Sequence, residues 1–166
     1  MAVFIADEQS VVEVDLDRLR DLTAYVMADR GVPDGMEVSV LCIERDAITA
    51  LNRTHMDSDG PTDVLAFPLD QPGETMPGDV AILGDVVVCP EIAAAQASEH
   101  GKTASQEIDL LVVHGLLHLL GHDHAEAQEK AVMFDLTDTL LAGFAHESAG
   151  FAQGLADFPQ GVEPQL

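Results

Sequence analysis

Four of the seven histidines lie within eleven residues, in the segment His114-Gly-Leu-Leu-His118-Leu-Leu-Gly-His122-Asp-His124. On a helix, His114 and His118 share one face, with Cβ atoms about 5–6 Å apart. That spacing lets both imidazoles bind one metal ion at about 2.0–2.1 Å. A helix end at Gly121 would let the chain turn, so that His124 supplies a third ligand. Three neutral imidazoles around a tetrahedral ion leave one position for water, as in catalytic sites.

These ligands favour zinc, one ion per chain, because imidazole suits zinc and zinc needs no redox partner. Nickel, copper and iron(II) accept the same ligand type. A zinc-bound water titrates near neutral pH, so the predicted chemistry is hydrolysis of a carbonyl or phosphoryl compound. His122 is expected to face solvent outside the metal shell. The remaining histidines, His55, His100 and His146, are expected to be surface residues.

The ligand spacing is also that of metzincin peptidases, in which a glutamate directly after the first histidine is the general base. Gly115 occupies this position and cannot transfer a proton. A peptidase or amidase would therefore need a base from elsewhere, such as Glu107. A second alternative is a non-catalytic metal-binding protein, in which His122 closes the shell as a fourth ligand and leaves no water site.

The elements around the histidines predict a buried central helix. Thr103 and Gln106 have the spacing of a capping box, and the helix that follows to about Leu120 is apolar almost all round. Asp15 predicts the N-cap of a helix that ends near Gly31. Further helices are expected over 46–56, 90–101 and 126–141, and strands over 11–14, 37–43, 64–67 and 80–88. This order is typical of an α+β domain with one small mixed sheet packed with helices, the metal site lying at the end of the central helix.

The composition limits the possible partners. The chain has 166 residues, of which 47% are apolar, and carries 30 Asp and Glu against 7 Lys and Arg, a formal charge of −23. Such a surface disfavours non-specific binding to nucleic acid or anionic lipid. Residues 1–144 are expected to form one domain, and residues 145–166 an acidic, loosely ordered C-terminal tail.

The N-terminus has no basic segment typical of a secretory signal. The longest apolar stretch, 108–121, is shorter than the roughly 18–20 residues that span a bilayer. Cys42 and Cys89 lie in apolar runs and are expected to be reduced core thiols. We therefore expect a cytoplasmic protein with no membrane partner.

The histidine segment HGLLHLLGHDH closely resembles the signature H-G-x-L-H-L-x-G-Y-D-H of the bacterial YbeY proteins, with His122 in place of the usual tyrosine. Leu51-Asn52 together with residues 61–67 resembles the second conserved block of that family, and residues 83–88 resemble the third. The three blocks follow in the correct order and cover roughly residues 51–124. The C-terminal tail lies outside the resemblance.

The resemblance implies a mixed sheet packed with helices, and zinc at His114, His118 and His124. It also implies a metal-dependent endoribonuclease that prefers single strands, matures the 3′ end of the small-subunit ribosomal RNA and helps to remove defective ribosomes. Ribosomal RNA is then the substrate, and DNA is not expected to be a partner. The acidic surface favours basic ribosomal proteins as further partners.

The other catalytic candidates are Asp63, Asp85 and Arg53. Both aspartates lie at strand starts in the family-like blocks, where a carboxylate could orient a ligand histidine or water. The structural alternatives are an Asx-turn or cap at Asp63 and a bulge or strand end at Asp85. Many members of the family carry an arginine where this chain has Met56, and Arg53 could substitute from one turn earlier. Met133, nine residues after His124, is expected to be a core residue.

Overall fold

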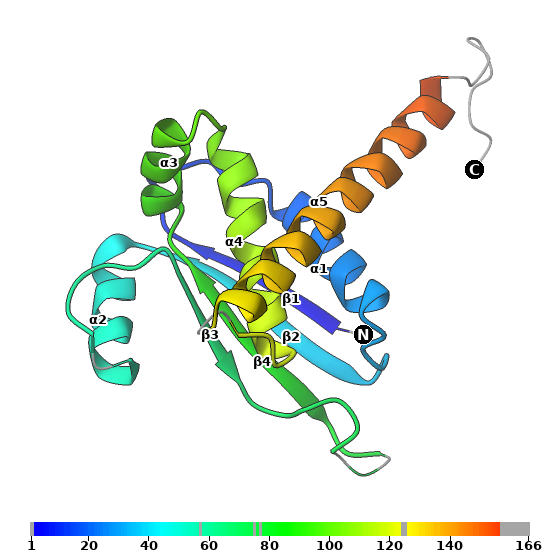
Figure 1. The fold of residues 1–166 in the computed structure, drawn as a ribbon, viewed down its shortest axis with the longest axis horizontal. Coiled ribbons are helices and arrows are strands. Elements are labelled where there is room, and N and C mark those ends of the chain that lie inside the picture. Colours follow the sequence, from blue (N-terminus) through cyan, green and yellow to red (C-terminus); the bar gives the residue numbers. More distant parts are fainter. Residues whose placement is uncertain (1, 57, 75, 77, 124–125, 157–166) are drawn as a thin grey trace.

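The structure of the chain is a computed structural model, which describes residues 2–56, 58–74, 76, 78–123 and 126–156. Four strands form one mixed sheet in the order β1-β2-β4-β3 (Figure 1). The parallel strands are β1 (Ala2–Glu8), β2 (Met36–Ile43) and β4 (Ala81–Val88), and the antiparallel edge strand is β3 (Val64–Pro68). The α+β class and the mixed sheet are as predicted.

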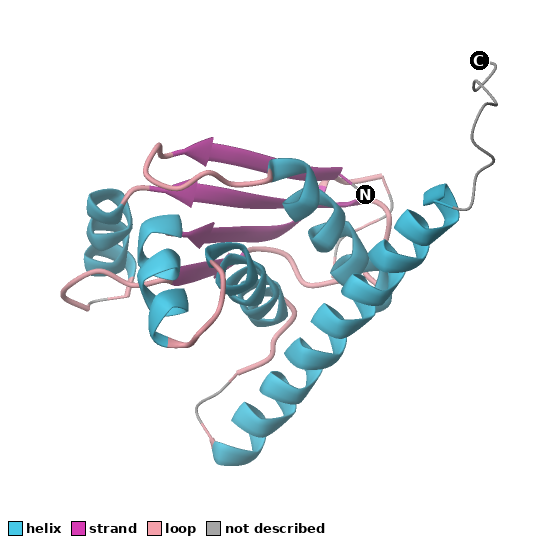
Figure 2. Ribbon diagram, turned by 90° about the horizontal axis from the view of Figure 1, so that it is seen from above, coloured by secondary structure: helices cyan, strands magenta, loops and turns pink. Residues whose placement is uncertain are grey.

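The helices are α1 (Leu16–Asp29), α2 (Arg45–His55), α3 (Pro90–Glu99), α4 (Ala104–Leu119) and α5 (Ala127–Ala156). Helices α1 and α4 pack side by side against one face of the sheet, and the long α5 runs obliquely across their outer side (Figure 2). Helix α2 contributes Ile48 to a smaller cluster with Leu65 and Val87. Because Val86 and Val88 join the main core instead, Val87 and α2 lie on the opposite face of the sheet. Within the described ranges, no helix is long and apolar enough to cross a membrane.

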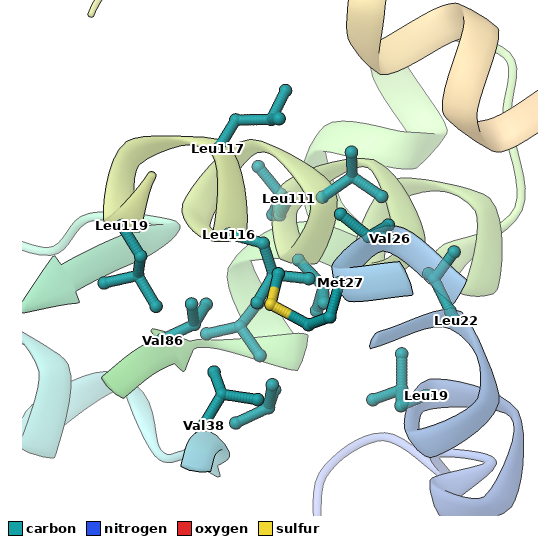
Figure 3. Close-up of a cluster of buried hydrophobic side chains, with 14 of the residues drawn as sticks. Leu19, Leu22, Val26, Met27, Val38, Val86, Leu111, Leu116, Leu117 and Leu119 are labelled. Atoms are coloured by element: carbon teal, nitrogen blue, oxygen red, sulfur yellow. The ribbon is translucent and has the colours of Figure 1, made fainter. Parts of the chain in front are cut away.

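Helix α4 is the centre of the main core. Leu116 and Leu119 lie with Met27 of α1, Val38 of β2 and Val86 of β4 in one cluster of buried side chains (Figure 3). The helix begins with the predicted capping box, in which Gln106 N donates to Thr103 Oγ1 and Thr103 N donates to Gln106 Oε1. Buried side chains lie around nearly the whole circumference of α4, as the sequence predicts for a central helix.

Gly115 allows α4 to approach the sheet closely. A Cβ atom at this position would lie 2.6 Å from Val86 Cγ1, closer than any relaxed carbon contact. The position that holds the catalytic glutamate in metzincins is therefore pressed against β4 in this chain. Any side chain larger than the hydrogen of glycine would require the helix to move. This packing gives a physical reason, besides proton chemistry, for the absence of a base at residue 115.

Two predictions about local structure differ from the observed fold. Residues 11–14 do not form a strand, because the Gln9 side chain accepts from the backbone amides of Val11 and Val12 and donates to the carbonyl of Val12, which closes a turn. The strand lies earlier, as β1, and pairs with β2 through long-range backbone contacts. Helix α5 continues to Ala156, so residues 145–156 are helical where a loosely ordered tail was predicted. Residues 157–166 lie outside the described residues.

Other local predictions are confirmed. Asp15 caps α1, accepting from Arg18 N at 3.1 Å. The register between β2 and β4 shifts at Leu83, one residue before Gly84. Cys42 and Cys89 are buried free thiols, and burial raises the pKa of Cys42 to about 12. Both cysteines therefore act as core residues.

The Arg18–Asp109 ion pair joins α1 to α4, and its removal should destabilise the fold. Arg18 Nη2 lies 2.7 Å from Asp109 Oδ2, and the Asp109 side chain is only 6% exposed. Replacing Arg18 by Met leaves this carboxylate buried without its cation, so we expect the free energy of unfolding at pH 7 to fall by about 1–3 kcal/mol in chemical denaturation. The control Arg20→Met, which removes an exposed pair with Asp17, should change it by less than about 0.5 kcal/mol.

The cost of Arg18→Met should shrink in acid. Burial raises the pKa of Asp109 even though Arg18 lowers it. The folded state therefore binds this proton more tightly than the unfolded state, and protonation as the pH falls removes the buried charge. Equal losses for Arg18→Met and Arg20→Met, or a pH-independent loss, would contradict this role.

The contact between Gly115 and Val86 predicts opposite effects of alanine at two helical glycines. At Gly150, where a Cβ meets nothing within 4 Å, alanine should stabilise the protein by up to about 1 kcal/mol. At Gly115, alanine should lower the free energy of unfolding by about 1–3 kcal/mol because of overpacking. In a Val86→Ala background this loss should be smaller. A stabilising Gly115→Ala would show that α4 does not depend on this close approach.

Candidate functional site

A cleft of about 850 Å³ opens along α4. Its walls come from the loop before β3, the C-terminal end of α3 and the first turns of α5. Helix α4 contributes a stripe of residues that includes Glu107, Leu111, His114 and His118. Residues spaced three and four apart lie on one side of a helix, so this stripe is the one side of α4 that faces the cleft.

The two histidines of α4 lie side by side on the cleft wall. The ring centroids of His114 and His118 are 5.1 Å apart, and both side chains are half-buried. Phe134 of α5 lies on the outer side of the pair, with its ring centroid 6.0 Å from that of His114. The two imidazoles therefore lie close together on one side of α4, as predicted.

The end of α4 turns as predicted. Gly121 has a φ of +95°, the left-handed conformation that favours glycine. The amide of Gly121 donates to the carbonyl of His118 and the amide of His122 donates to that of Leu117, both at 3.0 Å, which is the Schellman arrangement. The chain is thereby redirected directly after the second histidine. His124, the predicted third ligand, lies outside the described residues.

The His114–His118 pair has the geometry of two neighbouring metal ligands. Two imidazoles bound to one tetrahedral ion at about 2.0–2.1 Å have ring centroids about 5 Å apart, which agrees with the observed 5.1 Å. Over the described parts of the chain, no three His, Cys, Asp or Glu side chains gather as a metal-binding group. The fit to a metal therefore rests on these two residues.

Asp63 lies in the cleft and also has the local role that the sequence left as an alternative. Its Oδ1 accepts from Val64 N at 2.8 Å, and its backbone carbonyl accepts from Cys89 N at 2.9 Å. The loop that carries it is held by the buried Asn52, whose Nδ2 donates to the carbonyl of Gly60 at 3.1 Å. The half-buried Asp63 carboxylate is thus fixed at the wall opposite α4.

The structure does not bring the other two catalytic candidates to this cleft. Asp85 precedes Val86, whose side chain faces α4, so Asp85 points to the opposite face and lines a separate hollow of about 710 Å³. Arg53 is exposed on α2, with Nε 3.6 Å from Asp59 Oδ1, and does not line the cleft. Met56, at the position where the family often has arginine, does line it.

Several cleft residues were not assigned to the site from sequence. His100, expected on the surface, lines the cleft with its Nδ1 3.6 Å from Glu107 Oε2, and Lys102 lies at the same end. Glu107, which the sequence offered only as the base of the alternative peptidase, lies seven residues or about two helical turns before His114. Phe134 had no such signal, because its place depends on the packing of α5.

The remaining histidines and Met133 are placed as follows. His146 is exposed as expected, and the exposed His55 lies against Phe67, outside the cleft. His122 is half-buried and is not among the cleft-lining residues. Met133 is 1% exposed within the main core, which confirms its predicted structural role.

Comparison with known proteins gives a consistent assignment. The family model described as "Endoribonuclease YbeY" matches residues 4–145. The "Endoribonuclease YbeY" of Salinispora tropica is 44% identical over 152 residues, covering 87% of this chain and 96% of that protein. The protein of the same name from Thermobifida fusca is 44% identical over 147 residues, covering 87% of this chain and 94% of that protein.

The fold is also similar to a solved structure, the solution structure of TM1509 from Thermotoga maritima. The TM-score is 0.60 at 27% sequence identity, with 97% of this chain and 99% of that chain covered. Since the family model spans most of the sequence and curated relatives align over nearly their whole length, the chain belongs to the YbeY family of endoribonucleases, as its histidine segment predicts.

Proposed function

We propose that the protein is a metal-dependent endoribonuclease that acts on single-stranded ribosomal RNA during ribosome maturation. The observation that carries this proposal is the His114–His118 pair on the wall of an 850 Å³ cleft, in a chain of the YbeY family. The proposed substrate is the 3′ end of the small-subunit RNA, with a further role in the removal of defective ribosomes. The proposed compartment is the cytoplasm.

His114, His118 and His124 would hold one zinc ion, which suits three imidazole ligands. When bound, such an ion supplies Lewis-acid stabilisation of the charge that develops on a phosphoryl oxygen. Helix α4 contributes rigidity, because its other sides are buried and both rings project from adjacent turns. The half-buried state of the rings leaves them accessible from the cleft, as a catalytic rather than a closed structural site requires.

Three further cleft residues, Lys102, Asp63 and Phe134, would position the RNA. The Lys102 ammonium can contact a phosphate, because it forms no salt bridge with another described residue. Asp63 is held at the opposite wall by its bond to Val64 N, where its second carboxylate oxygen can accept a proton or orient a water. Phe134 supplies an apolar surface beside His114.

RNA is favoured over a peptide substrate. Gly115 is pressed against Val86, so a side chain at the position of the metzincin base would force α4 away from β4. Glu107, the alternative base, lies about two helical turns from His114. A purely metal-storing protein is also less favoured, because His122 does not line the cleft and so does not offer a fourth imidazole there.

The net charge of −23 implies that binding to free RNA is weak and depends on divalent ions. Basic ribosomal proteins would complement the acidic surface and present the RNA to the cleft. Affinity should therefore be greater for RNA within a ribosomal particle than for the same RNA alone.

Replacing His118 by Ala should abolish both stoichiometric metal binding and RNA cleavage. The loss of one of three protein ligands removes much of the affinity for the ion, so cleavage of a single-stranded RNA should fall at least about 100-fold. The measurements are metal content by mass spectrometry and cleavage with and without a chelator. His146→Ala is the matched control, because His146 is exposed on α5 away from the cleft. If His118→Ala keeps its metal and its activity, the proposal is wrong.

A further inference from the structure

The cleft contains a buried carboxylate with an unused hydrogen-bonding oxygen. Glu107 is 3% exposed, and its Oε2 accepts no hydrogen bond from any described residue. His100 Nδ1 lies 3.6 Å away, beyond hydrogen-bonding distance. Burying a carboxylate without donors costs free energy, so a ligand that brings N–H donors to this point would recover that cost.

We propose that Glu107 is a specificity-determining residue that accepts hydrogen bonds from the Watson–Crick edge of an unpaired guanine in the RNA substrate. This inference rests on the proposed function and extends it from a nuclease with no stated base preference to one that selects a base near the cleaved phosphate. It assigns the α3–α4 end of the cleft to base recognition and the His114–His118 end to cleavage.

The chemistry of a carboxylate selects among the parts of an RNA chain. An ionised carboxylate only accepts hydrogen bonds and repels phosphate, so the group it receives must be a neutral donor. Guanine presents two adjacent donors, N1–H and the N2 amino group, which match the two oxygens of one carboxylate. Adenine and cytosine each place an acceptor nitrogen beside their single amino group, and uracil has one N–H between two carbonyls. Unpaired bases are commonly read in this way, on their Watson–Crick edges.

The position of Glu107 suits a base attached close to the scissile phosphate. Glu107 and His114 are separated by seven residues of α4, or about 10 Å along the helix axis, a span that a nucleotide and its base can bridge. Leu110 and Leu111 line the cleft between them and offer an apolar surface to the sugar and base. Lys102 lies at the Glu107 end, where it can contact the neighbouring phosphate.

Glu107 is also held rigidly enough to discriminate between bases. It follows the capping box of α4 by one residue, and its amide donates to the carbonyl of Thr103 at 3.1 Å. Its side chain is almost fully buried, on a helix that packs against α3. A preorganised acceptor loses more binding free energy with a mismatched base than a mobile one, because it cannot move to find another donor.

The test uses zinc-loaded protein and short RNA oligonucleotides of adenine that carry one central guanine, inosine or adenine. Inosine keeps N1–H and lacks the N2 amino group. We expect kcat/KM to be about tenfold higher for the guanine substrate than for the all-adenine substrate, with inosine between them. Glu107→Gln should reduce this ratio to near one, because the amide offers only one acceptor. Glu99→Gln, the same change at an exposed carboxylate in the same cleft, should leave the ratio unchanged.

A binding measurement separates this inference from the proposed function. Fluorescence anisotropy with 2′-O-methyl versions of the oligonucleotides, checked by gel electrophoresis to remain intact, reports base preference without cleavage. The wild-type series does not depend on any variant folding. Cleavage at equal rates for guanine, inosine and adenine substrates, or an unchanged ratio in a folded Glu107→Gln protein, overturns the inference and leaves the nuclease proposal intact. Absence of cleavage of every oligonucleotide contradicts the nuclease proposal, and the inference then fails as well unless guanine is still preferred in binding.

Discussion

Burial of α4 on almost every side is the constraint on which the rest of the structure depends. Leu116 and Leu119 are fully buried against the sheet and α1, and Gly115 lets the helix lie directly on Val86 of β4. A helix enclosed in this way can carry polar side chains only where it meets the cleft or an ion-pair partner. Asp109 satisfies the second condition through Arg18, and Glu107, His114 and His118 satisfy the first. Packing and site geometry therefore have one cause.

The charge of the general surface and the charge of the cleft have different consequences for RNA binding. With 30 acidic and 7 basic residues, the chain cannot attract RNA through its general surface. Among the described cleft residues, Lys102 is then the cation that can offset phosphate charge, together with the proposed metal ion. This arrangement favours selectivity over affinity, since substrate must be held by a few specific contacts or delivered by a basic partner. A carboxylate such as Glu107 is compatible with this scheme because it meets a base edge rather than a phosphate.

Local sequence signals predicted the parts of the fold that depend on local interactions. The N-cap at Asp15, the capping box at Thr103, the glycine turn at Gly121 and the shared face of His114 and His118 all arise from spacings of a few residues. The errors concern longer-range interactions. Residues 11–14 have strand-like composition, but the Gln9 side chain holds them in a turn, and β1 exists because it pairs with β2.

The candidate site also depends partly on local sequence signals and partly on long-range packing. The side of the sheet on which Asp85 lies depends on the register shift at Leu83 and on which neighbour faces α4. The resemblance of this segment to a family block therefore did not reveal that Asp85 points away from the cleft. His100 and Phe134 reach the cleft only through the packing of α3 and α5. The resemblance to YbeY proteins pointed to the histidine segment, of which His114 and His118 line the cleft, whereas tertiary packing determined which other side chains surround them.

The most direct test of the central claim is X-ray absorption spectroscopy of the zinc-loaded protein. The account predicts three imidazole nitrogens at about 2.0–2.1 Å and one oxygen that exchanges with solvent or with a phosphate ligand. A shell of four nitrogens without an exchangeable oxygen would indicate a closed structural site. The same would follow if the spectrum were unchanged by added phosphate, and either result would contradict an α4 site built for catalysis.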